Sequence, residues 1–276
     1  MPKGRNLARG VLQLQDQSSA LPPIFSYLDD HTPLRYYEHV AILHGLKAPA
    51  VPWARLVSEG LHLGNWCYYL APPILQKDLL TRLREFGVKV ERHLEDKSLQ
   101  FPPDVFNPKC LVDSSQSFFA SAEGAHAPAV RWLEVGMRPG TETLPSSQYF
   151  EFHSRLNHLV KHYPSVALCH YDVEDLDIPH LFSAICVHRH LLVEGTLVRD
   201  NPFYIPAEQF LRLSPAEHNR DLREVFRTVG FDVSRLLATL AGYGQLQVAY
   251  HRDREIDVAR RGSRRGRDRG AHRNHP

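Results

Sequence analysis

The segment over residues 163–206 constrains the fold more than any other part of this sequence. It contains an apolar run at residues 166–171, an amphipathic stretch at 178–188 and a second apolar run at 190–194. Strand, helix and strand within about thirty residues is the spacing of a parallel βαβ unit. The segment therefore predicts a parallel sheet with a helix packed on one face.

Similar runs upstream extend this sheet. Apolar stretches that read as strands recur at residues 39–44, 66–71 and 130–135, and residues 74–87 and 148–162 carry apolar side chains at helical spacing. The expected strands are apolar throughout, which is typical of strands buried on both faces. We therefore expect an α/β fold, a three-layer sandwich whose mostly parallel sheet of five or six strands lies between helices.

The organisation expected along the chain has four parts. Residues 1–35 lack periodicity and predict a flexible N-terminal arm, and residues 36–212 form the α/β domain. A helical extension follows over residues 213–250, with a capping box at its start and glycines near residue 243 that are expected to interrupt it. Residues 251–276 are rich in Arg and Gly and are expected to be disordered.

Composition excludes a membrane protein and favours the cytoplasm. Of the 276 residues, 43% are hydrophobic and 23% charged, as in globular proteins. No run approaches the roughly 18 apolar residues that a membrane helix needs, and the N-terminus lacks the apolar core of a signal peptide. The four Cys are widely spaced and are expected to be free thiols.

The net charge of +2 is unevenly distributed. Residues 251–276 hold nine Arg against four Asp or Glu, so the tail carries +5 and the preceding residues carry −3. Such a tail can follow nucleic-acid phosphates electrostatically. A solvated terminus is the commoner meaning, so nucleic acid remains an alternative partner rather than the expected one.

Ligands of parallel α/β sheets bind beyond the carboxyl ends of the strands. That rule selects His44 after the first strand, and His170, Tyr171 and Asp172 after the fifth. These side chains would line a polar and aromatic crevice for a small molecule. Glu134, near the end of the fourth strand, could face the same cleft or bond a neighbouring turn.

Nucleotide hydrolysis and metal binding find little support. A P-loop would follow the first strand as GxxxxGK[ST], but the chain reads HGLKAPAVPW there. The seventeen His suggest a metal, and His188 and His190 form an HxH pair, but the pair straddles a turn. We therefore favour turn and surface histidines, with a metal site as the lesser alternative, and expect no cofactor.

Enzymatic activity is not expected either. Cys169 and His170 are adjacent on a strand, so their side chains point to opposite faces and cannot form a dyad. Cys169 is expected to belong to the core. An enzyme that used His44, His170 and Asp172 as acid and base groups would have no supporting motif, so we expect no catalytic residues.

Four blocks of the sequence resemble one family. They span residues 37–207 and read YEHVAILH, SEGLHLGNWCYYLAPP, YFEFHSRLNHLVKHYPSVALCHYD and VHRHLLVEGTLVRDNPFYIP. In this order they resemble the MEDS domain, the sensory domain of methanogens and methylotrophs, and the last two blocks are the specific part. The resemblance implies a RecA/KaiC-like fold without a P-loop. It also implies a non-catalytic domain that senses small hydrocarbon derivatives beside a kinase or DNA-binding partner.

The resemblance adds residues to the candidate site. His188 falls near the family's Thr-His-Pro turn, and the residues that match its pattern are His39, Glu151, Tyr171, Asp172, Asn201, Pro202, Phe203 and Tyr204. The chain departs from that pattern at Gly136, where an acidic residue is usual, and after His188, where Arg-His replaces His-Pro.

The sequence thus predicts a sensory protein that binds a small organic ligand and acts in signal transduction or transcriptional regulation. Two alternatives stay open. One is a degenerate nucleotide-binding protein that does not hydrolyse its ligand. The other is a scaffold whose helices around residues 214–240 dock a kinase or regulator.

Overall fold

A seven-stranded sheet forms the centre of the computed structural model, which describes residues 22–45, 51–102, 108–139 and 145–249. The strand order is β5-β4-β6-β7-β3-β8-β9. The strands are β3 (Glu38–His44), β4 (Trp66–Leu70), β5 (Leu99–Gln100), β6 (Val130–Glu134), β7 (Ser165–Asp172), β8 (His190–Val193) and β9 (Thr196–Val198). All neighbours are parallel except β8 and β9. The predicted α/β fold with a mostly parallel sheet is confirmed.

The sheet gains its antiparallel edge from a turn that the sequence analysis did not identify. Glu194 and Gly195 both adopt positive φ, 48° and 76°. Two such residues in succession are characteristic of a tight hairpin turn. The chain therefore reverses after β8 and returns as β9, instead of leaving the sheet.

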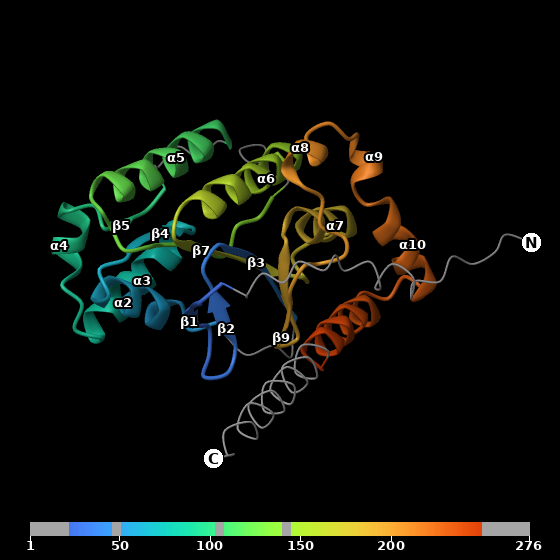
Figure 1. The fold of residues 1–276 in the computed structure, drawn as a ribbon, viewed down its shortest axis with the longest axis horizontal. Coiled ribbons are helices and arrows are strands. Elements are labelled where there is room, and N and C mark those ends of the chain that lie inside the picture. The colour runs from blue at the N-terminus through green and yellow to red at the C-terminus, as the bar shows by residue number, and fades with distance from the viewer. Residues whose placement is uncertain (1–21, 46–50, 103–107, 140–144, 250–276) are drawn as a thin grey trace, which may run out of the picture.

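Helices cover both faces of the sheet (Figure 1). One face carries α2 (Trp53–His62), α3 (Pro73–Glu85) and α4 (Val90–Glu95), and the other carries α5 (Pro108–Gly124), α6 (Ser146–His162) and α7 (Ile178–Val187). Alternate side chains of one strand enter different cores: Val40 and Ile42 pack on the α2 side, Ala41 and Leu43 on the α6 side. No helix in the described ranges is long and apolar enough to cross a membrane.

A short antiparallel hairpin, β1 (Ile24–Tyr27) and β2 (Pro33–Arg35), precedes the sheet. Asp29 accepts hydrogen bonds from the backbone N–H groups of His31 and Thr32, at 2.7 and 2.6 Å, and so stabilises the turn. The expectation of a flexible arm is therefore wrong for residues 24–35. Residues 1–21 lie outside the described part of the chain.

The C-terminal helices pack on the α6 side. They are α8 (Ala207–Phe210), α9 (Pro215–His218), α10 (Arg220–Thr228) and a helix over residues 233–249. The predicted capping box is present, since Glu217 accepts from the Ser214 N–H at 2.9 Å. The Arg-rich tail lies outside the described residues.

Gly244 does not interrupt the last helix, contrary to expectation. A Cβ atom at this position would lie 2.9 Å from Val198 Cγ2 and 3.0 Å from Thr196 Cγ2. The missing side chain therefore allows the helix to lie directly against β9.

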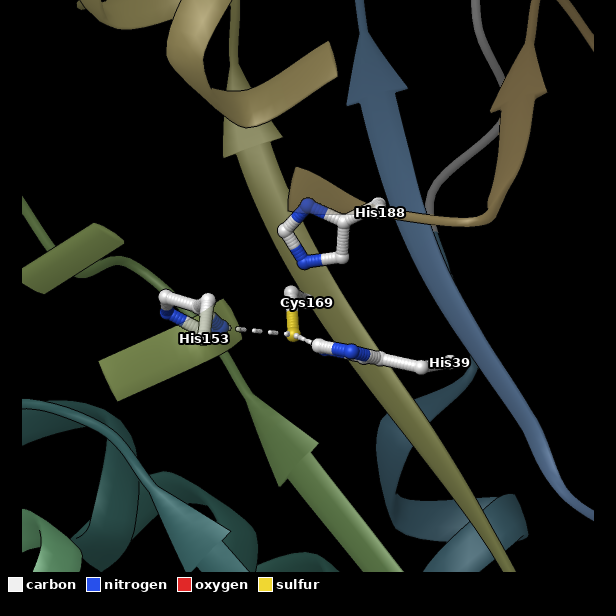
Figure 2. Close-up of side chains that lie close together, drawn as sticks. All are labelled: His39, His153, Cys169 and His188. Carbon is white, nitrogen blue, oxygen red and sulfur yellow. Dashed lines mark hydrogen bonds between the residues drawn. The ribbon is translucent and has the colours of Figure 1, made fainter. Parts of the chain in front are cut away.

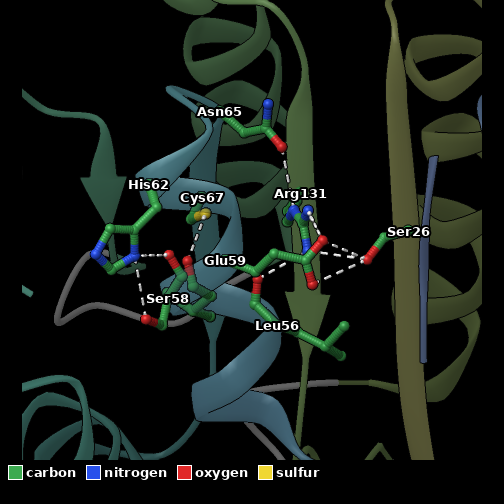
Figure 3. Close-up of polar contacts among 9 residues, drawn as sticks. Ser26, Leu56, Ser58, Glu59, His62, Asn65, Cys67 and Arg131 are labelled. Atoms are coloured by element: carbon green, nitrogen blue, oxygen red, sulfur yellow. Dashed lines mark hydrogen bonds and ion pairs between the residues drawn. The ribbon is translucent and has the colours of Figure 1, made fainter. Parts of the chain in front are cut away.

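Arg131 of β6 is a buried charge on the α2 side of the sheet (Figure 3). Its guanidinium donates to the Leu56 carbonyl at 2.8 Å, to Asn65 Oδ1 at 3.2 Å and to Glu59 Oε1 at 3.2 Å. A Cβ atom on Gly60 would lie 2.6 Å from Arg131 Cδ, so the helix can approach only because residue 60 is glycine. Ser26 of β1 also donates to Glu59, at 3.0 Å, so the network joins the hairpin, α2 and β6.

We predict that Glu59→Ala destabilises the fold by about 1.5–3 kcal/mol, the usual value of a hydrogen bond to a charged group. The substitution leaves the buried Arg131 without its counter-charge. Urea unfolding measures the loss. The control is Glu91→Ala, which breaks the exposed ion pair with Arg84 and should leave the unfolding midpoint unchanged. Equal behaviour of the two variants would contradict a structural role for the Arg131 network.

Candidate functional site

The predicted crevice at the strand ends is divided between the two faces of the sheet. His44 and His170 lie on the α2 side, with ring centroids 5.1 Å apart, and the ring of Trp53 lies 5.8 Å from that of His170. Tyr171 lies on the α6 side and is buried. The expectation that His44, His170 and Tyr171 line one crevice is therefore wrong, because neighbouring strand residues face opposite layers.

A small pocket of about 60 Å³ lies beside His44, at the carboxyl ends of β3 and β8. Its lining residues are Leu28, Asp29, Ile42, Leu43, His44, Val51, Pro52, Leu192, Glu194 and Gly195. The buried Nδ1 atom of His44 has no hydrogen-bond partner among the described residues. Burial, with a smaller effect of His44, lowers the pKa of His170 to about 4, so this imidazole is neutral at pH 7.

Four further side chains converge on the opposite face of the sheet (Figure 2). They are His39 of β3, His153 of α6, Cys169 of β7 and His188 at the end of α7. All are buried, and their nitrogen and sulfur donor atoms lie within 4.8 Å of one another. Cys169 Sγ is 3.1 Å from His39 Nε2 and 3.6 Å from His153 Nδ1. We refer to these residues as the His–Cys cluster.

The fold brings the cluster together through strand register and helix spacing. Cys169 pairs with Ala41 across the parallel strands, so His39, two residues before Ala41, faces the same layer. In α6, Tyr149, His153 and Asn157 recur every four residues within the buried face, which forms a polar line over the sheet.

The outward nitrogen of each imidazole lies beside an acceptor. His39 Nδ1 is 3.2 Å from Asn157 Oδ1, His153 Nε2 is 3.1 Å from Glu134 Oε2, and His188 Nδ1 is 2.7 Å from the Ala184 carbonyl. The His153–Glu134 contact has ion-pair distance without hydrogen-bond alignment. His188 Nε2, which is also buried, has no hydrogen-bond partner in the part of the chain that the structure describes.

Burial keeps members of the His–Cys cluster uncharged. It lowers the pKa of His39 and His188 well below the usual value, and neighbouring imidazoles add to the effect. It raises the pKa of Cys169 well above the usual value, with a further contribution from Glu134. At pH 7 these groups are therefore neutral imidazoles and a neutral thiol.

Glu134 is a fully buried carboxyl group beside the cluster. Tyr149 donates a hydrogen bond to Glu134 Oε1, and the Tyr149 hydroxyl lies 3.4 Å from that of Tyr171. Burial, followed by the effect of Glu134, raises the pKa of Tyr149. The predicted residues His39, Glu134 and Tyr171 thus meet at one place, although it is not the strand-end crevice.

Glu151 and Asp172 lie elsewhere. Glu151 is on the solvent side of α6, where it pairs with Arg155 at 2.7 Å. Asp172 is exposed, and its carboxylate accepts from the Glu174 N–H at 3.1 Å in the turn after β7.

Asn201 positions the end of α7. Its amide donates to the carbonyls of Ile185 and His188, at 2.7 and 3.0 Å, and so holds the segment that carries His188. The Tyr204 N–H donates to the Asn201 carbonyl at 3.0 Å in the same loop. Both residues therefore support the cluster from outside.

Sequence reasoning missed His153 and assigned Cys169 to the core alone. The available signal for His153 was the four-residue spacing of Tyr149, His153 and Asn157 on an otherwise apolar helix face. No local pattern connects His153 with Cys169, because strand register and helix packing determine their contact.

Comparisons with known proteins give a curated relative, a similar solved structure and a matching family model. The transcriptional repressor DcmR of Methylorubrum extorquens is 23% identical over 157 residues, 56% of this chain and 59% of the relative. The chain thus spans about three fifths of that relative's length. The flagellar accessory protein FlaH from Methanocaldococcus jannaschii aligns over 63% of this chain and 83% of its own, with a TM-score of 0.39 and 12% identity.

A family model described as MEDS, the MEthanogen/methylotroph, DcmR Sensory domain, matches residues 51–189. The matched segment includes His153, Cys169 and His188, and it runs from α2 to the end of α7. This chain belongs to the MEDS family.

Proposed function

We propose that this chain is a non-catalytic sensory domain that binds a small organic molecule and passes the signal to a kinase or transcription regulator. Its family and its similarity to a transcriptional repressor support a regulatory sensory role. The observation that carries the ligand proposal is the pocket beside His44, whose buried Nδ1 has no partner in the described structure.

The place of the pocket in the sheet supports a ligand site. The chain leaves β3 in one direction to reach β4, and it leaves β7 in the other direction to reach β8. Ligands of open α/β sheets bind at the strand ends where the connections diverge in this way. The pocket lies at the ends of β3 and β8, next to this divergence.

The lining indicates the chemistry of the ligand. Apolar side chains such as Leu28, Ile42 and Leu192 dominate, and the polar residues of the lining are Asp29, His44 and Glu194. The volume of about 60 Å³ is far below the 300–1,000 Å³ of sites for drug-sized ligands. A short hydrocarbon derivative with one polar or halogen substituent fits this description better than a nucleotide.

A short path leads from the pocket to the C-terminal helix. Glu194 and Gly195 line the pocket and also form the turn into β9. The next strand, β9, contacts Gly244 of the helix over residues 233–249, and the Arg199 N–H donates to Gln247 Oε1 at 3.0 Å. A ligand that moves the turn would therefore shift the helix.

We predict that short halogenated or oxygenated hydrocarbons stabilise the protein in a thermal-shift screen. A ligand at 100 times its Kd adds about 2.7 kcal/mol to the free energy of unfolding. His44→Ala should weaken this effect, because it removes the polar nitrogen of the pocket, whereas Glu151→Ala on the solvent side of α6 should not. A panel that leaves the wild-type melting temperature unchanged at millimolar concentrations would count against the proposal.

Millimolar ATP–Mg should leave the melting temperature unchanged, because the pocket is too small for a nucleotide. The same thermal-shift measurement tests this expectation. Stabilisation by ATP–Mg would instead favour the degenerate nucleotide-binding alternative.

We also predict that Gly244→Leu uncouples the helix from the pocket. The new side chain cannot fit against Val198 and Thr196, so the helix should detach while the pocket still binds. Hydrogen exchange measures ligand-dependent protection of residues 233–249, which should disappear. Gly242→Leu is the matched control, since nothing lies within 4 Å of a Cβ there, and it should keep that protection. Retained protection in Gly244→Leu would exclude this path.

A further inference from the structure

We propose that His39, His153, Cys169 and His188 bind one transition-metal ion of the zinc type. The proposal stands on the geometry of the His–Cys cluster and does not depend on the pocket beside His44. The two sites lie on opposite faces of the sheet.

The donor atoms are close to the positions that a tetrahedral ion requires. Zinc bonds of about 2.0–2.1 Å to nitrogen and about 2.3 Å to sulfur place neighbouring donors roughly 3.3–3.8 Å apart. Cys169 Sγ lies 3.1 Å from His39 Nε2 and 3.6 Å from His153 Nδ1, and the whole set lies within 4.8 Å. Side-chain movements of roughly 1 Å or less would complete the coordination sphere.

The outward contacts orient two of the three rings for metal binding. A ligating histidine ordinarily donates its second N–H to a carboxylate, an amide or a backbone carbonyl. Such acceptors are the Asn157 amide for His39 and the Ala184 carbonyl for His188. For His153, the Glu134 carboxyl group lies 3.1 Å from Nε2, without hydrogen-bond alignment. The Asn157 amide is itself oriented, because its Nδ2 donates to the carbonyls of His153 and Val187.

A count of protons argues against a cluster held by hydrogen bonds alone. The outward acceptors place the ring N–H groups of His39 and His188 on the outside, so their lone pairs point inward. The Cys169 thiol has a single proton to share between these two nitrogens.

The surplus of lone pairs is visible at His188. Its Nε2 atom is buried and has no hydrogen-bond partner among the described residues. A buried polar atom without a partner destabilises a fold, typically by about 1–3 kcal/mol. One metal ion would satisfy this atom and the other inward lone pairs together.

The donor set selects the class of metal. Imidazole and thiolate ligands suit Zn²⁺, Co²⁺ or Cu⁺, whereas Mg²⁺ and Ca²⁺ require oxygen. On binding, Cys169 releases its proton to solvent and coordinates as thiolate. This thiolate would supply one negative charge to the ion, and the Glu134 carboxyl group lies beside the cluster, 3.1 Å from His153 Nε2. Four protein ligands close the site, which is typical of structural zinc rather than catalytic zinc.

Metal analysis and cobalt substitution test the proposal on the full chain. Protein refolded with Zn²⁺ and dialysed should retain about one equivalent by elemental analysis. The Co²⁺ form should show the intense visible bands of a tetrahedral site and a thiolate-to-cobalt charge-transfer band. Cys169→Ser should lose the charge-transfer band, and His153→Ala should retain less than half an equivalent of metal.

Cys67→Ser is the matched control, because Cys67 is equally buried but lies in the core on the α2 side. It should keep both the metal and the charge-transfer band. If Cys169→Ser does not fold, X-ray absorption of the wild-type zinc protein should still give one sulfur and three nitrogen neighbours. Less than a tenth of an equivalent of retained metal, an oxygen-only shell, or equal cobalt spectra for the two serine variants would overturn the proposal.

Discussion

The two-residue alternation of side chains in a sheet buried on both faces governs the rest of this structure. Each central strand supplies two separate cores, so residues adjacent in sequence enter different chemical environments. Cys169 joins the histidines under α6, whereas His170 meets His44 and Trp53 on the α2 side. The alternation therefore produces two polar sites from one stretch of β7.

The Arg131 network on the α2 side and the His–Cys cluster on the α6 side are buried polar groups whose hydrogen bonds are satisfied to different degrees. Arg131 on the α2 side reaches Leu56, Asn65 and Glu59. The hydrogen bonds of this guanidinium are all made to residues of the described structure, so a structural role is sufficient to explain the network. The His–Cys cluster has more inward acceptors than donors, and two of its buried nitrogens, His153 Nε2 and His188 Nε2, have no hydrogen-bond partner among the described residues. This imbalance, rather than the mere presence of histidines, supports a bound ion.

Much of the fold can be predicted from local sequence, because uninterrupted apolar runs and apolar residues at helical spacing indicate directly which residues are buried. The βαβ unit over residues 163–206 appears in the structure as β7, α7 and β8. The hairpin at residues 24–35 and the close approach of the last helix to β9 at Gly244 depend on a few specific contacts. The periodicity of apolar residues therefore does not predict them. In the site, the alternation that separated Cys169 from His170 also separates His170 from Tyr171. His153 could not be connected with Cys169, because their contact depends on how α6 packs over β7.

The two proposed sites share their supporting strands, which suggests how one would serve the other. His39 lies near the start of β3 and His44 at its end, while His188 lies two residues before the start of β8, the strand that ends at the pocket. An ion held by His39, Cys169 and His188 would fix β3, β7 and the start of β8 relative to one another. A sensor needs a rigid frame on one side of its ligand and a movable wall on the other. The metal would provide that frame, and the β8–β9 turn, which contacts the C-terminal helix through β9, would remain the part that a ligand can move.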